Sequence, residues 1–77
     1  MKNKRKTWIP NEHIVIVGRN IKKIRTKKRL TQNQLAKKLC VSRSHICQLE
    51  YGIKTSMDKA ERIAEALGVP VEELFQD

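Results

Sequence analysis

The residues with the clearest capacity for chemistry lie between Ser42 and Gly52. On a helix that turns about 100° per residue, the polar side chains of this stretch fall on one side, and Ile46 and Leu49 fall on the other. The polar set is Arg43, Ser44, Cys47, Gln48 and Tyr51. Arg can bind guanine O6 and N7 bidentately, Gln can bind adenine N6 and N7, and Ser can bind either kind of edge. Arg43, Ser44 and Gln48 are therefore the candidates for contacts to base edges in the major groove of DNA.

Two short helices must position these side chains. Ser42 is a helix-capping residue type, and Gly52 can end the helix of about 43–51 that follows it. Thr31 and Gln34 have the capping-box spacing. This spacing predicts a helix that starts after Thr31, ends at about Leu39 and comes before the helix of about 43–51. A three-residue break separates the two helices, so the second can be held outward by the first.

The flanking segments predict further helices. An apolar stripe at spacings of three and four, formed by Ile14, Val17, Ile21 and Ile24, predicts a first helix. Its start stays open, because Gly18 interrupts the pattern and residues 14–17 could instead form a short strand. A fourth helix runs from the cap at Ser56 to Gly68, and Pro70 begins a fifth short helical turn. The fold class is all-α, with five short helices in one domain of residues 14–77, preceded by a basic N-terminal arm of residues 1–13.

The charge is strongly segregated along the 77 residues, whose net charge is +9. Residues 1–43 hold 14 basic residues and one acidic one, whereas residues 44–77 hold three basic and seven acidic residues. This asymmetry favours a polyanion on one side of the molecule and solvent or a protein partner on the other.

Several other functions are disfavoured. No apolar run is long enough for a membrane span or a signal peptide, so a cytoplasmic location and no membrane partner are expected. Cys40 and Cys47 lack the paired spacing of a zinc site and are too few for a disulfide framework, so we expect no metal and no cofactor. An enzyme is the poorest interpretation, because no nucleophile lies near a base at a defined spacing. The three aromatic residues are too few for an RNA-stacking platform.

Residues 18–75 resemble the Cro and C1 repressor type of helix-turn-helix, also called the xenobiotic-response-element family. The resemblance rests on GRNIKKIRTKKRLTQNQLAKKL, VSRSHICQLEYG and AERIAEALGVPVEELF taken together. It implies a lambda-repressor-like fold in which Arg43, Ser44 and Gln48 contact bases. The positions that it matches to phosphate contacts are Gln32, Ser42, Tyr51 and Lys54. It also implies that Gln32 braces the second helix of the motif, and that Arg25 and Glu50 form a structural ion pair.

The resemblance fails at Cys40, where the family often has a glycine because the chain turns with a positive φ. His45 lies at the edge of the apolar sector, and we expect packing there more than DNA contact.

The leading hypothesis is a repressor that binds a near-palindromic DNA operator as a homodimer. The two copies would meet through the apolar tail of Val69, Val71, Leu74 and Phe75 or through the segment from Trp8 to Val17. The alternative is a protein-interaction module of antitoxin or anti-repressor type whose acidic half binds a protein partner.

Overall fold

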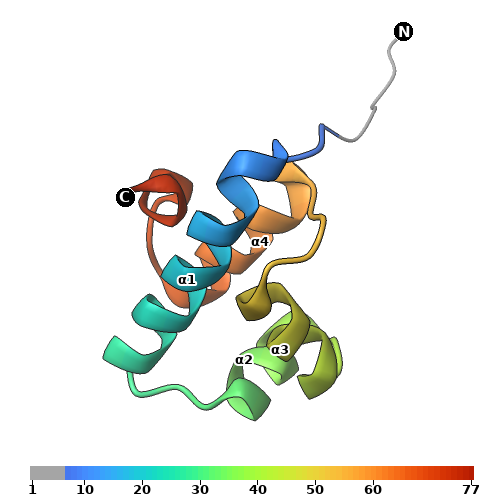
Figure 1. The fold of residues 1–77 in the computed structure, drawn as a ribbon. Helices are drawn as coiled ribbons and strands as arrows, with labels where there is room; N and C mark the ends of the chain where they lie inside the picture. The colour runs from blue at the N-terminus through green and yellow to red at the C-terminus, as the bar shows by residue number, and fades with distance from the viewer. Residues whose placement is uncertain (1–6) are drawn as a thin grey trace, which may run out of the picture.

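Four α-helices and one 3-10 helix make up the computed structural model, which describes residues 7–77 (Figure 1). The elements are α1 (Asn11–Lys27), α2 (Gln32–Leu39), α3 (Arg43–Tyr51), α4 (Met57–Leu67) and the 3-10 helix η1 (Val71–Phe75). The all-α class is confirmed, but the expectation of five helices is corrected to four α-helices, because the turn after Pro70 is a 3-10 helix. The strand alternative for residues 14–17 is wrong, since they lie within α1.

Side-chain caps set the helix boundaries, as the sequence predicts. The Thr31 hydroxyl accepts from the backbone N–H of Gln34 at 3.0 Å, and the Gln34 side chain accepts from the N–H of Thr31 at 2.8 Å. Ser42 and Ser56 cap α3 and α4 in the same way, each by accepting from the N–H three residues later. Gly52 and Gly68 end these two helices in the left-handed conformation that glycine adopts without strain.

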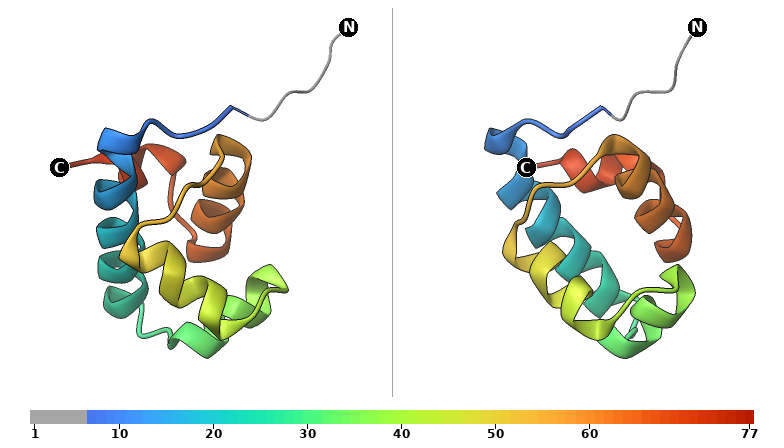
Figure 2. Two further views of the ribbon diagram at one scale, coloured as in Figure 1. Left: turned by 45° about the vertical axis from the view of Figure 1, so that its right-hand side comes forward. Right: turned by 90° about the vertical axis from the view of Figure 1, so that its right-hand side faces the viewer.

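Helix α1 connects the two ends of the molecule. It packs against α3 along one part of its length and against η1 along another, while α2 packs against both α3 and α4 (Figure 2). At the crossing of α1 and α3, a Cβ on Gly18 would lie 2.6 Å from the Leu49 carbonyl oxygen and 2.8 Å from that of Glu50. The glycine that interrupts the apolar pattern therefore lets α1 approach the backbone of α3.

The core includes residues from all five elements. Its largest fully buried side chains are Ile21, Leu35, Ile46, Ile63 and Leu74. The burial of Leu74, at 0% exposure, corrects the expectation that it belongs to an exposed apolar tail for dimerisation. Asn20 holds this tail by donating from Nδ2 to the carbonyl oxygens of Leu74 and Gln76, at 2.9 and 2.6 Å.

The chain before α1 joins the body of the protein. The N–H of Ile9 donates to the Thr55 carbonyl at 2.9 Å, and the N–H of Met57 donates to the Thr7 carbonyl at 2.7 Å. Ile9 is in the core, and α1 begins at Asn11, so residues 11–13 form the first turn of that helix. Residues 1–6 of the expected basic arm lie outside the described residues, and the boundary after residue 13 stays a prediction. Within residues 7–77, no helix combines the length and the apolar character that crossing a bilayer needs.

Candidate nucleic-acid interface

Helix α3 presents one exposed polar stripe and one buried apolar side. Arg43, Ser44, Cys47, Gln48 and Tyr51 are all exposed, with Tyr51 at 87%. Ile46 and Leu49 point into the core and anchor the helix. The three candidates for base contact, Arg43, Ser44 and Gln48, thus lie on the same accessible side of one helix.

The turn between α2 and α3 keeps the left-handed geometry although it lacks a glycine. Cys40 has φ 58° and ψ 43°, and its N–H donates to the Lys37 carbonyl at 3.2 Å. The N–H of Val41 donates to the Ala36 carbonyl at 3.0 Å, which closes the end of α2 in a Schellman-type arrangement. The turn expected from the resemblance is therefore present, and Cys40 bears its steric cost.

A chain of polar contacts runs from the interior to the surface of α3. Arg25 donates from Nε to Oε2 of Glu50 at 2.6 Å and from Nη2 to Oε1 at 3.3 Å. Gln32 donates from Nε2 to the same Oε1 at 3.0 Å, and Arg43 donates from Nη1 to Oε1 of Gln32 at 2.9 Å. Arg25 also donates to the Leu30 carbonyl at 2.7 Å. Three helices thereby hold Arg43 through one continuous network.

The carboxylate of Glu50 determines how the Gln32 amide is oriented in this network. The side chains of Arg25 and Glu50 are 11% and 5% exposed, so the ion pair is shielded from water. A carboxylate only accepts hydrogen bonds, so Gln32 must turn its amide nitrogen towards Glu50 and its oxygen towards Arg43. One guanidinium nitrogen of Arg43 is then held, while the other donors remain accessible.

The side chains of His45 in α3 and Lys59 in α4 contact each other. The Lys59 ammonium lies 3.2 Å from Nε2 of His45, which joins α3 to α4. Desolvation by burial, and then the charge of Lys59, lower the pKa of His45 from its ordinary value of 6.5. The imidazole is neutral at pH 7 and can accept the Lys59 hydrogen bond.

Comparison with known proteins identifies the architecture. A family model described as Helix-turn-helix matches residues 21–74. The chain belongs to the Cro/C1-type helix-turn-helix family. An immunity repressor protein of Bacillus phage phi105 is 43% identical over 56 residues, which make up 71% of this chain. The match spans 39% of the length of that repressor.

Solved helix-turn-helix structures have the same fold. The restriction-modification controller protein C.AhdI from Aeromonas hydrophila matches 80% of this chain and 96% of its own, with 32% identity and a TM-score of 0.75. The biofilm master regulator SinR, solved in complex with DNA, matches 78% of this chain and 98% of its own, with 27% identity and a TM-score of 0.69.

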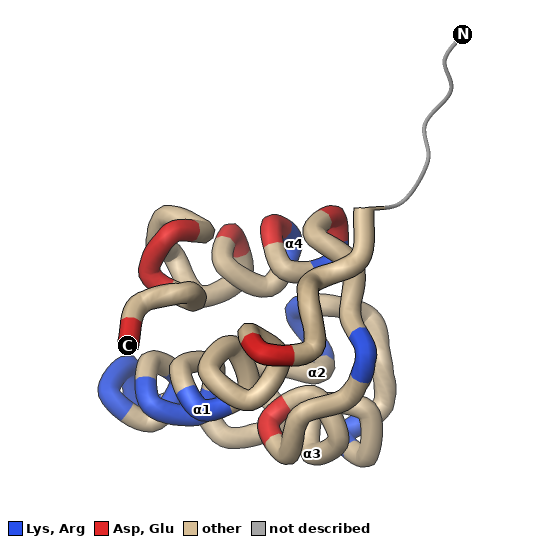
Figure 3. The backbone as a smooth tube through the Cα atoms, turned by 45° about the horizontal axis from the view of Figure 1, so that its top comes forward, with Lys and Arg blue, Asp and Glu red and all other residues tan. Residues whose placement is uncertain are grey.

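The charges of this helix-turn-helix protein are divided between its elements. Lys and Arg follow α1, whereas Asp and Glu gather on α4 and the C-terminal turn (Figure 3). Two cations interrupt the acidic part: α4 carries Lys59 and Arg62. Both cysteines have free thiols and are exposed.

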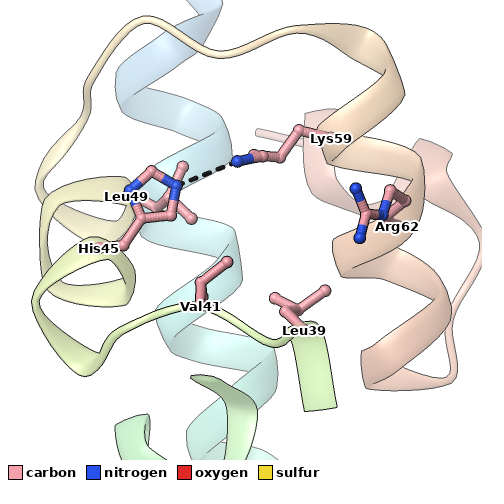
Figure 4. Close-up of a pocket in the computed structure, with 6 residues that line it drawn as sticks. All are labelled: Leu39, Val41, His45, Leu49, Lys59 and Arg62. Carbon is pink, nitrogen blue, oxygen red and sulfur yellow. Dashed lines mark hydrogen bonds between the residues drawn. The ribbon is translucent and has the colours of Figure 1, made fainter. Parts of the chain in front are cut away.

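Two contacts near the helix-turn-helix motif escaped sequence reasoning. Trp8 lies beside the connection of α3 to α4, with the Lys54 ammonium 5.0 Å from its ring centroid, and Lys59 reaches His45 (Figure 4). Neither pair has a helical spacing or belongs to a known motif. The sequence shows that residues 54 and 59 are positively charged, but it does not show which side chains they contact.

Proposed function

We propose that the protein is a sequence-specific DNA-binding transcriptional regulator, a repressor, that inserts α3 into the major groove. The observation that carries this proposal is the exposed Arg43, held in place by Gln32 at 2.9 Å beside Ser44 and Gln48. An ordered arginine on an exposed helix is well suited to bidentate contact with guanine. The resemblance to a phage immunity repressor supports the direction of regulation.

Four further side chains are proposed as contacts to phosphates. Gln32 uses one amide hydrogen for Glu50 and retains a second for a phosphate oxygen. Ser42 accepts from the N–H of His45, which leaves its own hydroxyl hydrogen to donate. Tyr51 and Lys54 are exposed at and just after the end of α3. Such contacts position a protein on the duplex without reading its sequence.

A homodimer on a near-palindromic operator is the proposed assembly. One α3 covers only a few base pairs, and a two-fold dimer would place two such helices in major grooves about 34 Å apart. The protein must be in the same compartment as its operator DNA, so the cytoplasmic location expected from the sequence is part of the same proposal.

Selection of bound sequences from a random duplex library tests this function directly. We expect enrichment of a motif with two-fold symmetry and half-sites separated by about one helical turn of 10–10.5 base pairs. Binding without any enrichment would contradict sequence-specific regulation. Enrichment of a single half-site without symmetry would contradict the dimer alone.

A pair of matched variants tests the roles of individual residues. Arg43→Ala should relax the preference at one G·C position, at a cost of about 1–3 kcal/mol on the preferred sequence. Lys54→Ala should instead weaken binding to all sequences alike. An unchanged sequence profile for Arg43→Ala would exclude base reading by this side chain.

A further inference from the structure

The outer face of α1 carries a short stripe of side chains that point away from the core. Glu12, Val15 and Arg19 are exposed, and Ile16 beside them is half-buried. At about 100° per residue, these four positions fall within about 100° of the helix circumference. Their spacing, at i, i+3, i+4 and i+7, is that of a helix face that packs against another helix. Val15 is 56% exposed, so its apolar side chain is largely uncovered within one copy.

The other sides of α1 have partners within the chain. Ile14, Val17 and Ile21 face the core. Gly18 lies against the backbone of α3, and Asn20 donates to two carbonyl oxygens near the C-terminus. Helix α1 forms one edge of the molecule in the left view of Figure 2, and the stripe lies opposite to the core residues on the helix circumference. Substitutions in the stripe should therefore leave the stability of a single copy little changed.

The charges of the stripe fit a second copy of the same surface. Residues 1–43 contain one acidic residue, Glu12, and it lies seven positions before Arg19. In two antiparallel α1 helices related by a two-fold axis between positions 15 and 16, positions 12 and 19 are equally far from the axis. Glu12 of each copy then faces Arg19 of the other, and Val15 and Ile16 meet across the axis. An apolar centre with an ion pair on each side makes this surface complementary to itself.

We propose that two copies of the protein pair through this stripe of α1, antiparallel about that two-fold axis. The proposal rests on the homodimer of the proposed function and names its surface. The sequence left two dimer surfaces open. In the apolar tail Leu74 is buried in the core, whereas Val15 of the rival segment is exposed. The partner is a second copy, because a partner surface of uniform charge would set a like charge against either Glu12 or Arg19.

The lysines further along α1 favour the antiparallel orientation. Helix α1 begins at Asn11, so positions 22 and 23 extend past the start of the helix in the other copy. At 1.5 Å per residue, the two copies of Lys23 would lie about 20 Å apart. In a parallel pair, Lys22 and Lys23 of one copy would lie beside the same residues of the other and repel them.

The arrangement turns both α3 helices to the same face of the dimer. Gly18 and Arg25, which contact α3, lie about 110–130° around α1 from the middle of the stripe. The two-fold axis of an antiparallel pair is perpendicular to the plane of the two helices, hence about 90° from the stripe, so α3 lies within about 40° of the axis direction. A two-fold rotation leaves the direction of its axis unchanged. Both copies therefore present α3 on one side.

The spacing of the two α3 helices also fits DNA. Arg25 begins the network that holds Arg43. It lies about 9.5 residues from the axis, so its two copies would be about 28 Å apart along α1. With about 8–10 Å between the helix axes, the two networks come about 30 Å apart. Successive major grooves on one face of DNA are about 34 Å apart.

The overlap of the two helices is short. Residues 11–20 of each copy face each other, which amounts to about 15 Å of helix. A contact of this length is small against the roughly 800 Å² per partner of a standard stable interface. We therefore expect the copies to associate weakly in solution, and more strongly when two half-sites hold them on one duplex.

Crosslinking tests the surface without DNA. In a Cys40→Ser/Cys47→Ser background, Val15→Cys places one thiol per copy beside the two-fold axis. The matched control Thr26→Cys places one at an exposed position of α1 outside the overlap. At concentrations where sedimentation shows dimers, a short bismaleimide should link two copies of the Val15→Cys protein and not of the control. Dimers in which Val15→Cys links no better than Thr26→Cys would overturn the pairing.

Charge reversal tests the ion pairs. Glu12→Arg and Arg19→Glu each turn two opposite-charge contacts into two like-charge contacts, because the axis repeats them. Cooperativity is measured as the affinity of the second copy for a duplex with two half-sites, relative to that of the first. Each single variant should lower it by about 10- to 30-fold, and Glu12→Arg/Arg19→Glu should restore it. Glu61→Arg, at an exposed position of α4, is the matched control and should keep the parent ratio.

The outcomes separate this surface from the proposed function. Crosslinking at position 15 together with rescue by the double variant supports the α1 surface. A symmetric operator with unchanged cooperativity in both single variants overturns the α1 surface and leaves the proposed dimer to another face. Monomers at every concentration, with and without DNA, overturn both the surface and the dimer. If the parent bound no duplex at all, the proposed function would fail, while crosslinking would still decide on the surface.

Discussion

The shielded ion pair of Arg25 and Glu50 gives the sharpest prediction about stability. Replacing either partner alone, as Arg25→Met or Glu50→Leu, leaves the other charge in a site that is 11% or 5% exposed. A shielded charge that is left without its partner lowers the free energy of unfolding by about 3–5 kcal/mol. At roughly 0.05–0.15 kcal/mol per residue, a domain of this size has about 4–12 kcal/mol in total. Each single variant should therefore lose a large fraction of its stability.

The double variant should recover most of this loss. With both charges removed, the remaining penalties are the Leu30 carbonyl and the Gln32 amide, which lose their partners at about 1 kcal/mol each. We therefore expect Arg25→Met/Glu50→Leu to lie within about 2 kcal/mol of the parent, because apolar pairs of similar volume often replace buried ion pairs without loss. The coupling energy should exceed about 3 kcal/mol.

Urea unfolding followed by circular dichroism measures all four proteins, with sucrose added to populate the folded state of the single variants. Arg19→Met, at an exposed position of α1, is the control and should change stability by less than about 0.5 kcal/mol. Single variants that lose under about 1 kcal/mol would refute the reasoning, because the pair would then behave like one on the surface. A double variant as unstable as the sum of the singles would refute it too.

Three further predictions concern single positions. Gly18→Ala should lower the free energy of unfolding by about 2 kcal/mol, because overpacking against the carbonyls of α3 costs up to about 3 and the gain in helix propensity is about 1; thermal unfolding measures it. Cys40→Gly should raise the free energy of unfolding by about 0.5–1 kcal/mol, because glycine relieves the left-handed strain at φ 58°. The control Cys47→Ser should change it by less than about 0.5 kcal/mol. A lower free energy of unfolding for Cys40→Gly would contradict the strain. The lowered pKa of His45 means that the unfolded chain binds a proton first as the pH falls below 6.5, so the protein should lose stability on acidification through that value. Urea unfolding of His45→Gln above and below pH 6.5 should show a smaller loss than the parent, and equal losses would exclude the histidine as the cause.

The helix boundaries could be predicted because their causes are local. Thr31 and Gln34 satisfy each other's backbone within three residues, and Ser42, Ser56 and Gly52 act within one turn of the helix that each begins or ends. The exposed stripe of α3 was predictable for the same reason, since Ile46 and Leu49 alone decide which side faces the core. The roles of Arg43, Ser44 and Gln48 on DNA stay predictions.

Contacts between distant parts of the chain could not be predicted from local patterns, and the ion pair of Arg25 and Glu50 was expected only from the family resemblance. In the sequence Gly18 interrupts the apolar pattern of the first helix, yet its missing side chain allows α1 to cross α3. The sequence predicts that Leu74 is available to a partner, yet it is buried and its carbonyl is bound by Asn20, 54 residues away. A single sequence shows that a residue is apolar or small, but the packing of other elements decides whether it is covered. The same applies to His45 and Lys59, which meet across two helices.

The polar network suggests why a protein with such a small core retains a buried ion pair that apolar residues could replace. The carboxylate of Glu50 can only accept, so it orients the Gln32 amide, and that amide presents an oxygen to Arg43. An apolar pair at positions 25 and 50 could restore stability but would leave Gln32 free to rotate. The double variant should therefore fold and still discriminate poorly at the base that Arg43 is proposed to read. On that proposal, the ion pair serves the orientation of the Arg43 side chain more than the stability of the fold.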